Sequence, residues 1–242
     1  MKKALPIGVD NFERVITDGY YYIDKTMLIK ELLDLKGEVN LFTRPRRFGK
    51  TLNLSMLRYF FEDTGDAEKN ARNKALFQGL KIMEAGEEYI EQMGSCPVLN
   101  LTLKSAKQED YDTACYMMRS EIASEFDRHR DILERGRELL TPNEYEQYLS
   151  VAEEKVDEKQ LRGALKLFCK CMFKVTGKNT VLLIDEYDVP LENAYFSGFY
   201  EEMVSFIRSL FEAGLKTNDY LQFAVITGCL RISKESIFTG LN

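Results

Sequence analysis

The chain has 242 residues, 45% of them hydrophobic, which is enough for one large domain or for a core with an elaborate insertion. Its net charge of −6 excludes a general electrostatic attraction to nucleic acid and leaves only a local basic patch open. The five cysteines lack the C-x2-C spacing of zinc sites, and no apolar run is long enough for a signal peptide or a membrane span, so we expect a cytoplasmic protein.

The first part of the sequence predicts a helix, a strand, a loop and a second helix. Apolar residues at helical spacing indicate a helix from Met27 to Leu35, with Asp24 as its N-cap and Gly37 as its stop. The short apolar segment 39–43 predicts a strand, and helical periodicity resumes after residue 50. The loop between them has the context of a phosphate-binding loop, in which backbone amides and a helix N-terminus converge on one anion.

The middle of the chain is mainly helical. Residues 62–95 predict short helices, and residues 96–103 predict a buried strand. A long helix is expected from Tyr111 to about Leu140, and a later one over 157–175. The 77 residues that separate this strand from the next exceed the usual connection in α/β units. We therefore expect a helical lobe, at about residues 104–178, inserted into a single domain that spans 1–242.

Two further apolar strands follow, with a helix between them. Residues 181–184 form a continuous apolar run that ends in carboxylates, a pattern typical of strands buried on both faces of a parallel sheet. A helix over 199–214 is expected to stop at Gly214, and residues 220–228 predict another apolar strand. The alternation of strands and helices predicts an α/β domain with a mostly parallel sheet flanked by helices.

The candidate nucleotide-binding residues lie in the loop after the first strand. Lys50 carries a compact positive charge that suits β and γ phosphates, the Thr51 hydroxyl can bind magnesium, and Gly49 lets the backbone approach closely. The predicted nucleotide-binding segment is continuous, and its members are Arg46, Arg47, Phe48, Gly49, Lys50, Thr51 and Leu52.

Arginine side chains replace part of the usual glycine pattern of such a loop. Arg44 stands where the first glycine normally lies. Arg46 and Arg47 either bind phosphate oxygens or lie on the outer face of the loop, against the inserted helices or a nucleic acid.

The candidate metal-binding and catalytic residues follow the two later strands. Asp185 is placed to complete a magnesium site with Thr51, and Glu186 to polarise the attacking water. The alternative is a strand that ends in a solvated acidic turn. Thr227 and Arg231 could sense the γ phosphate, or could instead cap a helix that begins near residue 231.

Several segments together resemble the bacterial AAA-ATPase-like family: LPIG, YYIDKT, TRPRRFGKTLNLSML, CPVLNLTL, LLIDEYDVPL and ITGCLRISKESIFTGLN. The resemblance covers nearly the whole chain and includes the arginine at position 44. It implies a P-loop NTPase of the additional-strand, catalytic-glutamate type. Members of this AAA-ATPase-like family usually also carry a C-terminal PD-(D/E)XK nuclease-like domain.

The same resemblance implies roles for individual residues. Lys50 and Thr51 correspond to the end of the Walker A motif, and Asp185 and Glu186 to Walker B. Thr227 and Arg231 take a sensor-like position. The leading motif of the family places three further residues near the base, although they could equally be packing and capping residues: Ile7, Tyr22 and Asp24.

The chain ends at Asn242, before the further strand and the nuclease-like domain expected from the family, so we expect a truncated form. In the usual strand order 5-1-4-3-2, the missing strand lies beside the loop strand. Segment 39–43 would then be an open edge, covered by helices of this chain or by another subunit.

The expected function is Mg²⁺-dependent binding and hydrolysis of ATP, used as a switch or motor that moves the helical lobe. An alternative is a nucleotide-dependent binding module with little turnover, and another is a structural scaffold without nucleotide affinity. The absence of an Asn-Lys-x-Asp guanine-reading motif favours adenine. The expected partner is a second copy of the chain or another protein, bound through the helical lobe or the open sheet edge. Nucleic acid is implied only by the family resemblance.

Overall fold

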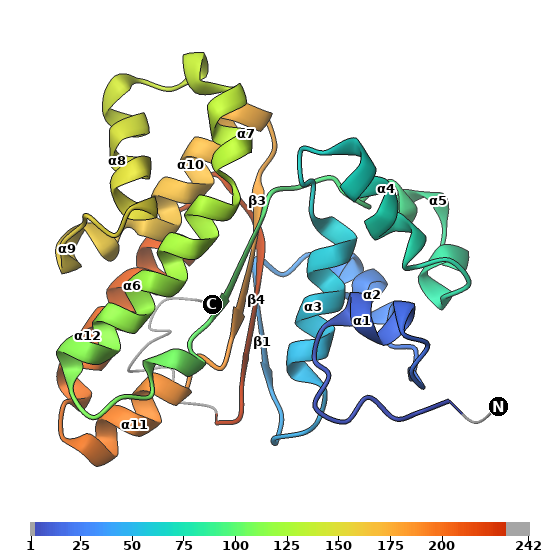
Figure 1. Ribbon diagram of the computed structural model, residues 1–242, viewed down its shortest axis with the longest axis horizontal. Coiled ribbons are helices and arrows are strands. Elements are labelled where there is room, and N and C mark those ends of the chain that lie inside the picture. Colours follow the sequence, from blue (N-terminus) through green and yellow to red (C-terminus); the bar gives the residue numbers. More distant parts are fainter. Residues whose placement is uncertain (1–2, 231–242) are drawn as a thin grey trace.

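The computed structural model describes residues 3–230, in which four parallel strands form one sheet with helices on both faces (Figure 1). The strand order is β1-β4-β3-β2. The α/β prediction is therefore confirmed, and all four predicted strands form: β1 Val39–Thr43, β2 Val98–Thr102, β3 Thr180–Asp185 and β4 Leu221–Gly228.

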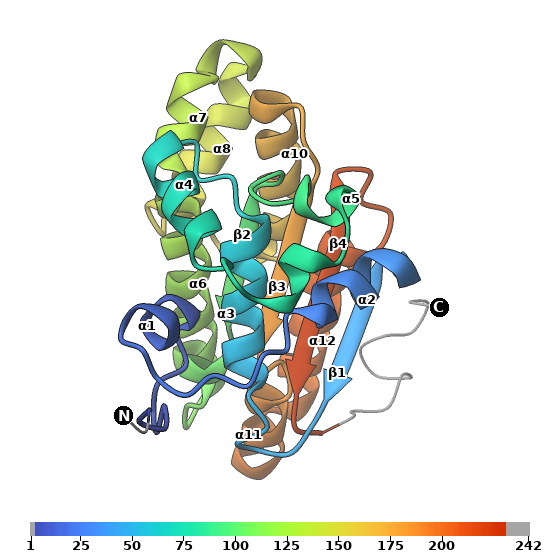
Figure 2. The same ribbon diagram turned by 90° about the vertical axis from the view of Figure 1, so that its right-hand side faces the viewer.

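One face of the sheet is covered by the helices that precede β2 (Figures 1 and 2). Among them, α3 packs directly on β2, β3 and β4. The helices of this face are α1 Phe12–Thr17, α2 Met27–Leu35, α3 Lys50–Phe61, α4 Ala67–Ala75 and α5 Glu87–Ile90.

The opposite face is covered by the helices that follow β2 (Figure 1). They are α6 Tyr111–Arg128, α7 Arg130–Arg135, α8 Pro142–Ala152, α9 Glu158–Leu161, α10 Ala164–Thr176, α11 Val189–Ser197 and α12 Tyr200–Leu215. Helices α6 to α10 lie within the segment expected to form a lobe, but α6 contacts β2 and α10 contacts both β3 and α12. Whether they move as a separate lobe stays a prediction. Residues 3–230 contain no helix with both the length and the apolar character needed to cross a bilayer.

The strands divide their side chains between two apolar cores, one on each face of the sheet. In β3, Leu182 and Ile184 belong to the core under α6, α10 and α12, whereas Val181 and Leu183 belong to the core under α3. All six residues of β3 are buried. This two-sided burial is why the strand reads as a continuous apolar run.

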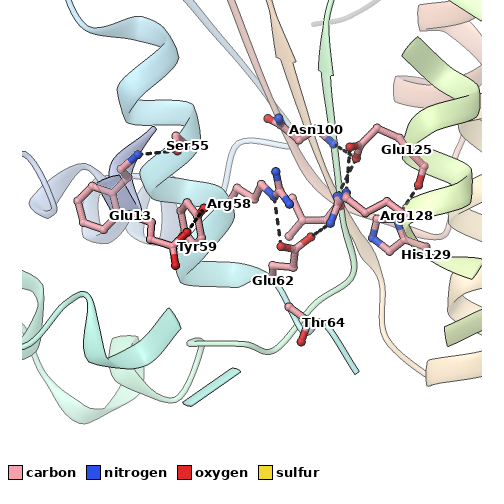
Figure 3. Close-up of polar contacts among 12 residues, drawn as sticks. Glu13, Ser55, Arg58, Tyr59, Glu62, Thr64, Asn100, Glu125, Arg128 and His129 are labelled. Atoms are coloured by element: carbon pink, nitrogen blue, oxygen red, sulfur yellow. Dashed lines mark hydrogen bonds and ion pairs between the residues drawn. The ribbon is translucent and has the colours of Figure 1, made fainter. Parts of the chain in front are cut away.

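The backbone of edge strand β2 is partly satisfied by polar side chains of α6 (Figure 3). The amide of Asn100 donates to a Glu125 carboxylate oxygen at 2.7 Å, and the Arg128 guanidinium donates to the carbonyl of Val98 at 2.7 Å. Arg128 also pairs with Glu62, the residue that follows α3. The polar groups therefore close this edge of the sheet and join α3 to α6.

Glu62 is a buried carboxylate held in its charged form. Burial would raise its pKa, but the charges of Arg128 and Arg58 outweigh that effect and hold the pKa below its usual value. The Arg58 Nε donates to Glu62 at 3.2 Å. Removing either arginine would leave a buried charge short of a partner, which is costly.

At the opposite edge of the sheet, β1 pairs only with β4 within residues 3–230. The observed order β1-β4-β3-β2 corresponds to the 1-4-3-2 part of the expected strand order. The covering of β1 by helices of this chain or by another subunit stays a prediction.

Four local predictions were wrong. The helix expected over 157–175 is instead two helices, α9 and α10, separated at Arg162 and Gly163. The N-cap of α2 is Thr26, and Asp24 instead accepts hydrogen bonds from Thr26 and from the amide of Lys81. The helix expected from Tyr111 to Leu140 ends at Arg128, where the following residue, His129, leaves helical geometry. Gly214 lies inside α12 rather than beyond it.

Gly214 is needed for close packing between α12 and α10. A Cβ at this position would lie 2.7 Å from the Cβ of Leu165, closer than side chains tolerate. We expect Gly214→Ala to destabilise the fold by about 1–3 kcal/mol, although alanine favours an unconstrained helix. Gly163→Ala, whose new Cβ has 3.6 Å to its nearest neighbour, is the control and should change stability by less than ~1 kcal/mol. Urea denaturation measures both, and an equal or greater stability of the Gly214 variant would contradict the packing argument.

His129 is the one histidine in the sequence, and it is buried. Burial and the neighbouring Arg128 charge lower its pKa to about 4. Its Nδ1 bonds the carbonyl of Glu125 at 2.8 Å, and its ring packs edge-on against Phe168. The folded protein therefore resists protonation of this imidazole.

We expect stability to fall as the pH drops from about 6.5 to about 4, because there the unfolded chain binds a proton that the folded chain does not. The largest contribution from His129 is roughly 3 kcal/mol. Urea midpoints of the unaltered protein and of His129→Gln should differ by a constant amount above the unfolded-state pKa, and below it the unaltered protein should lose stability that the variant does not lose. Proton NMR can follow this single imidazole directly, and titration near 6.5 would contradict the interpretation.

Candidate functional site

Because the strands are parallel, the carboxyl ends of β1, β3 and β4 all lie at the same end of the sheet (Figure 2). The Thr51 hydroxyl, in the first turn of α3, donates to Asp185 Oδ2 at 2.6 Å. The Thr227 hydroxyl, near the end of β4, donates to Oδ1 of the same carboxylate. Three predicted residues from distant parts of the sequence thus meet at one carboxylate, which is only 5% exposed.

The Lys50 ammonium lies inside the loop that connects β1 to α3. It donates to the carbonyls of Arg44 at 2.8 Å and Pro45 at 3.1 Å, and lies 3.4 Å from the Cys229 sulfur. Its charge is therefore held between the start of the loop and the end of β4.

The loop backbone leaves the N-terminus of α3 open. Gly49, with φ 77°, is the N-cap residue, and it has no side chain to bond the first helical amides. Arg47 also has a positive φ of 70°, so the loop turns sharply before the helix. Unpaired amides and the helix dipole make this end attractive to an anion.

The side chains of the loop face solvent. Arg44, Arg46, Arg47 and Phe48 are all exposed. The Arg44 guanidinium donates to the carbonyl of Thr43. Within residues 3–230, neither Arg46 nor Arg47 has a side-chain hydrogen bond or ion pair, so both are available to an anion.

Glu186 lies beside Asp185 in an unusual backbone conformation. Its φ is 54°, and its amide donates to Asp185 Oδ1 at 3.0 Å. Burial and the Asp185 charge raise the pKa of the Glu186 carboxyl, and the positive charges of Lys104 and Lys50 oppose that shift only in part. A carboxylate with a raised pKa suits a general base.

Glu186 borders a polar cavity of about 290 Å³ on the β2 side of the site. Its other lining residues are Asp10, Asn11, Thr51, Leu54, Ser55, Arg58, Asn100, Leu101, Thr102, Lys104 and Asp185. The cavity joins the candidate metal-binding residues to the end of β2.

Asp188 positions the chain that leaves β4. Its Oδ2 accepts from the amides of Cys229 at 2.8 Å and Leu230 at 2.7 Å. A Cβ on Gly228 would lie 2.7 Å from Asp188 Oδ1 and 2.6 Å from the Tyr187 ring, so glycine is required for this close approach. This link between Asp188 and the end of β4 gives no signal in the sequence.

The three residues of the leading motif make no hydrogen bond to Asp185, Thr51 or Thr227 in the described part of the chain. Ile7 is 87% exposed. The Tyr22 hydroxyl contacts the Met56 sulfur at 3.7 Å, and Asp24 bonds Thr26 and Lys81. These are packing and turn-forming contacts, and a nucleotide contact stays a prediction for all three.

Lys25, which sequence reasoning passed over, lies closer to the loop. Its ammonium lies 3.9 Å from the position that a Cβ on Gly49 would occupy. Its place between Asp24 and Thr26 in the YYIDKT segment was the available signal. Arg231, the remaining predicted residue, lies outside the described residues.

Comparisons with known proteins agree with this fold. The chain matches the family described as "Predicted AAA-ATPase" over residues 6–238. It is 30% identical over 243 residues to an uncharacterized protein in the vnfD 5′ region of Azotobacter chroococcum mcd 1. All of the chain is aligned, and it spans about 40% of the length of that relative. No solved structure matches it. Since the family match covers nearly the full length, the chain belongs to the predicted AAA-ATPase family.

Proposed function

We propose that the chain binds ATP with Mg²⁺ and hydrolyses it, in the manner of a P-loop NTPase of the additional-strand, catalytic-glutamate type. The observation that carries the proposal is the Asp185 carboxylate, which accepts both the Thr51 and Thr227 hydroxyls beside the Lys50 loop. The strand order β1-β4-β3-β2 and the Asp-Glu pair at the end of β3 support that type.

The residues at this position fit a magnesium ion. Mg²⁺ takes oxygen ligands, commonly one or two from protein, with phosphate and water completing the set. Thr51 Oγ1 and Asp185 Oδ2, 2.6 Å apart, would hold it, and no larger acidic cluster is needed or present among residues 3–230. When bound, the ion neutralises charge on the β and γ phosphates.

Each nearby side chain then has a distinct task. Lys50 exchanges its two carbonyl contacts for phosphate oxygens, and the α3 amides bind the same phosphates. Glu186 accepts a proton from the attacking water. Thr227 orients Asp185 through its hydroxyl, and the exposed Arg46 and Arg47 add positive charge at the rim.

A nucleotide-dependent binding module with little turnover is the second candidate. The Glu186 side chain has no hydrogen-bond partner in residues 3–230, so nothing there fixes the carboxylate in a catalytic position. A partner or a second copy could supply that constraint. The proposed function has two further parts. Helices α6 to α10 move in response to nucleotide, and the protein acts in connection with nucleic acid.

Lys50→Ala should weaken Mg·ATP binding by roughly 10- to 100-fold, because it removes a charge-assisted contact to phosphate. Isothermal titration calorimetry measures the change. Lys159→Ala, at an exposed lysine of α9 on the other face of the sheet, is the matched control and should bind as the unaltered protein does. Equal affinity in the Lys50 variant would exclude the proposed phosphate site.

Glu186→Gln should retain Mg·ATP binding and lower the hydrolysis rate by about 10²- to 10⁴-fold, since an amide cannot accept the proton. Glu192→Gln, on the exposed side of α11, is the control. The hydrolysis rate of the unaltered protein should fall as the pH is lowered through a value above 4.5. Glu186 must be deprotonated to act as the general base, and its pKa is raised above the ordinary value. Binding without hydrolysis above background in the unaltered protein would support the binding module instead.

A further inference from the structure

We propose that a polar cavity at the amino end of the strands, between the turn that follows α3 and helix α7, binds a small zwitterion of the amino-acid class. The cavity has a volume of about 610 Å³, which is within the range of small-ligand sites. Figure 2 shows α4 and α7 at this end of the sheet, whereas Asp185 lies at the carboxyl end of β3. This proposal is therefore independent of the proposed function.

One buried group that lines the cavity has no hydrogen-bond partner. His129 is 1% exposed, and its Nε2 makes no hydrogen bond within residues 3–230. Because Nδ1 bonds the carbonyl of Glu125, which can only accept, the ring proton lies on Nδ1. Burial lowers the pKa of the ring to about 4, so the imidazole is neutral near pH 7 and Nε2 is a bare acceptor. A ligand that donates a hydrogen bond to Nε2 would remove the cost of leaving this acceptor unpaired.

The α7 side of the cavity offers a second acceptor without a partner. The Asp131 carboxylate is exposed and makes no hydrogen bond or ion pair within residues 3–230. Arg128, on the same side, is compensated by Glu62 and Glu125. No three His, Cys, Asp or Glu side chains in the described part of the chain are arranged to hold a metal ion. The match for His129 and Asp131 is therefore an organic cation with N–H donors, such as an ammonium group.

The neighbouring charges on α7 favour the same cation. Arg135 donates to the carbonyls of Asp131 and Gly65, which anchors its guanidinium to the backbone. Glu134 also lines the cavity, and it accepts a hydrogen bond from the Tyr145 hydroxyl. The α7 wall thus carries two carboxylates against one arginine and has a net negative charge.

The opposite wall, formed by α3, α4 and the turn between them, offers unpaired donors. Arg58 donates through Nε to Glu62, and its two terminal nitrogens make no hydrogen bond within residues 3–230. The Lys69 ammonium is exposed and lies 3.9 Å from Asp66, whose carboxylate already accepts the first amides of α4. These two cations can bind a carboxylate from a ligand.

The two walls together fit a ligand that carries both charges. In Figure 3, Arg58 projects from α3 and His129 lies at the end of α6, with Glu62 between them. A carboxylate on the α3–α4 wall and an ammonium on the α7 wall would use the groups that this protein leaves unpaired. The cavity is lined by equal numbers of basic and acidic side chains, so a ligand without net charge preserves their balance. Bound in this way, the ligand joins the two layers of helices that cover opposite faces of the sheet.

His129 is the one histidine in the sequence, so ¹⁵N-labelled histidine gives a single imidazole reporter at the cavity. The probes are glycine, β-alanine and 4-aminobutyrate, which hold a carboxylate and an ammonium at increasing separations. Butyrate and butylamine carry one of the two charges each. We expect at least one zwitterion to shift the Nε2 resonance saturably, with a Kd of about 1 mM or below. Butyrate and butylamine should bind at least about 10-fold more weakly.

Lys69→Met and Asp131→Asn test the two walls separately, and both positions are exposed, so neither change should unfold the protein. Each should weaken binding of the best zwitterion by about 10-fold. Lys69→Met should leave butylamine binding unchanged, and Asp131→Asn should leave butyrate binding unchanged. Lys159→Met and Asp112→Asn, at exposed helix positions outside the cavity, are matched controls and should bind as the unaltered protein does. Thermal melting checks that each variant is folded.

Absence of a saturable shift with all three zwitterions would overturn the site. Equal affinity for butyrate or butylamine would overturn it too, because one charge would then suffice. Unchanged zwitterion binding in both folded variants would also contradict it. None of these results bears on nucleotide binding at Lys50 or hydrolysis by Glu186, which lie at the other end of the strands.

Discussion

The site depends on one buried carboxylate that must be paired. Asp185 lies at the end of a fully buried strand, and a charge in that position is costly unless hydrogen bonds compensate it. The hydroxyls of Thr51 and Thr227 provide those bonds, one from α3 and one from β4. The same contacts that make the charge tolerable also bring the loop, the sheet and the β4 terminus together. The stability of the fold and the proposed nucleotide chemistry therefore both depend on this carboxylate.

Helix α3 connects that carboxylate to the far side of the molecule. Its first turn carries Thr51, and its last turn and C-cap carry Arg58 and Glu62. Glu62 pairs with Arg128 of α6, whose guanidinium also bonds the edge strand β2 (Figure 3). A displacement of α3 relative to the sheet would disturb a buried ion-pair network that tolerates little change in geometry. This is a physical route by which the proposed nucleotide binding would act on α6 and its neighbours.

Features with local causes were predictable. The strand at 39–43, the helix from Met27 to Leu35 and the buried strand at 181–184 follow from the periodicity of their apolar residues, and all three are present. Features caused by contacts between distant segments were not. The role of Gly214 is set by Leu165 on another helix, and the helix break at His129 occurs where that residue is buried against Phe168. Sequence periodicity carries no information about such neighbours.

Sequence alone determined the chemical types at the site: a lysine and a threonine after one strand, an acidic pair after another and a threonine at the end of a third. Parallel packing follows from these patterns because buried apolar strands joined by helices run in one direction. Only the tertiary structure decided which groups touch. It joined Thr51 and Thr227 to opposite oxygens of Asp185 and brought Lys25 to Gly49. Those pairings depend on distances across the sheet and between helices, which no spacing along the chain encodes.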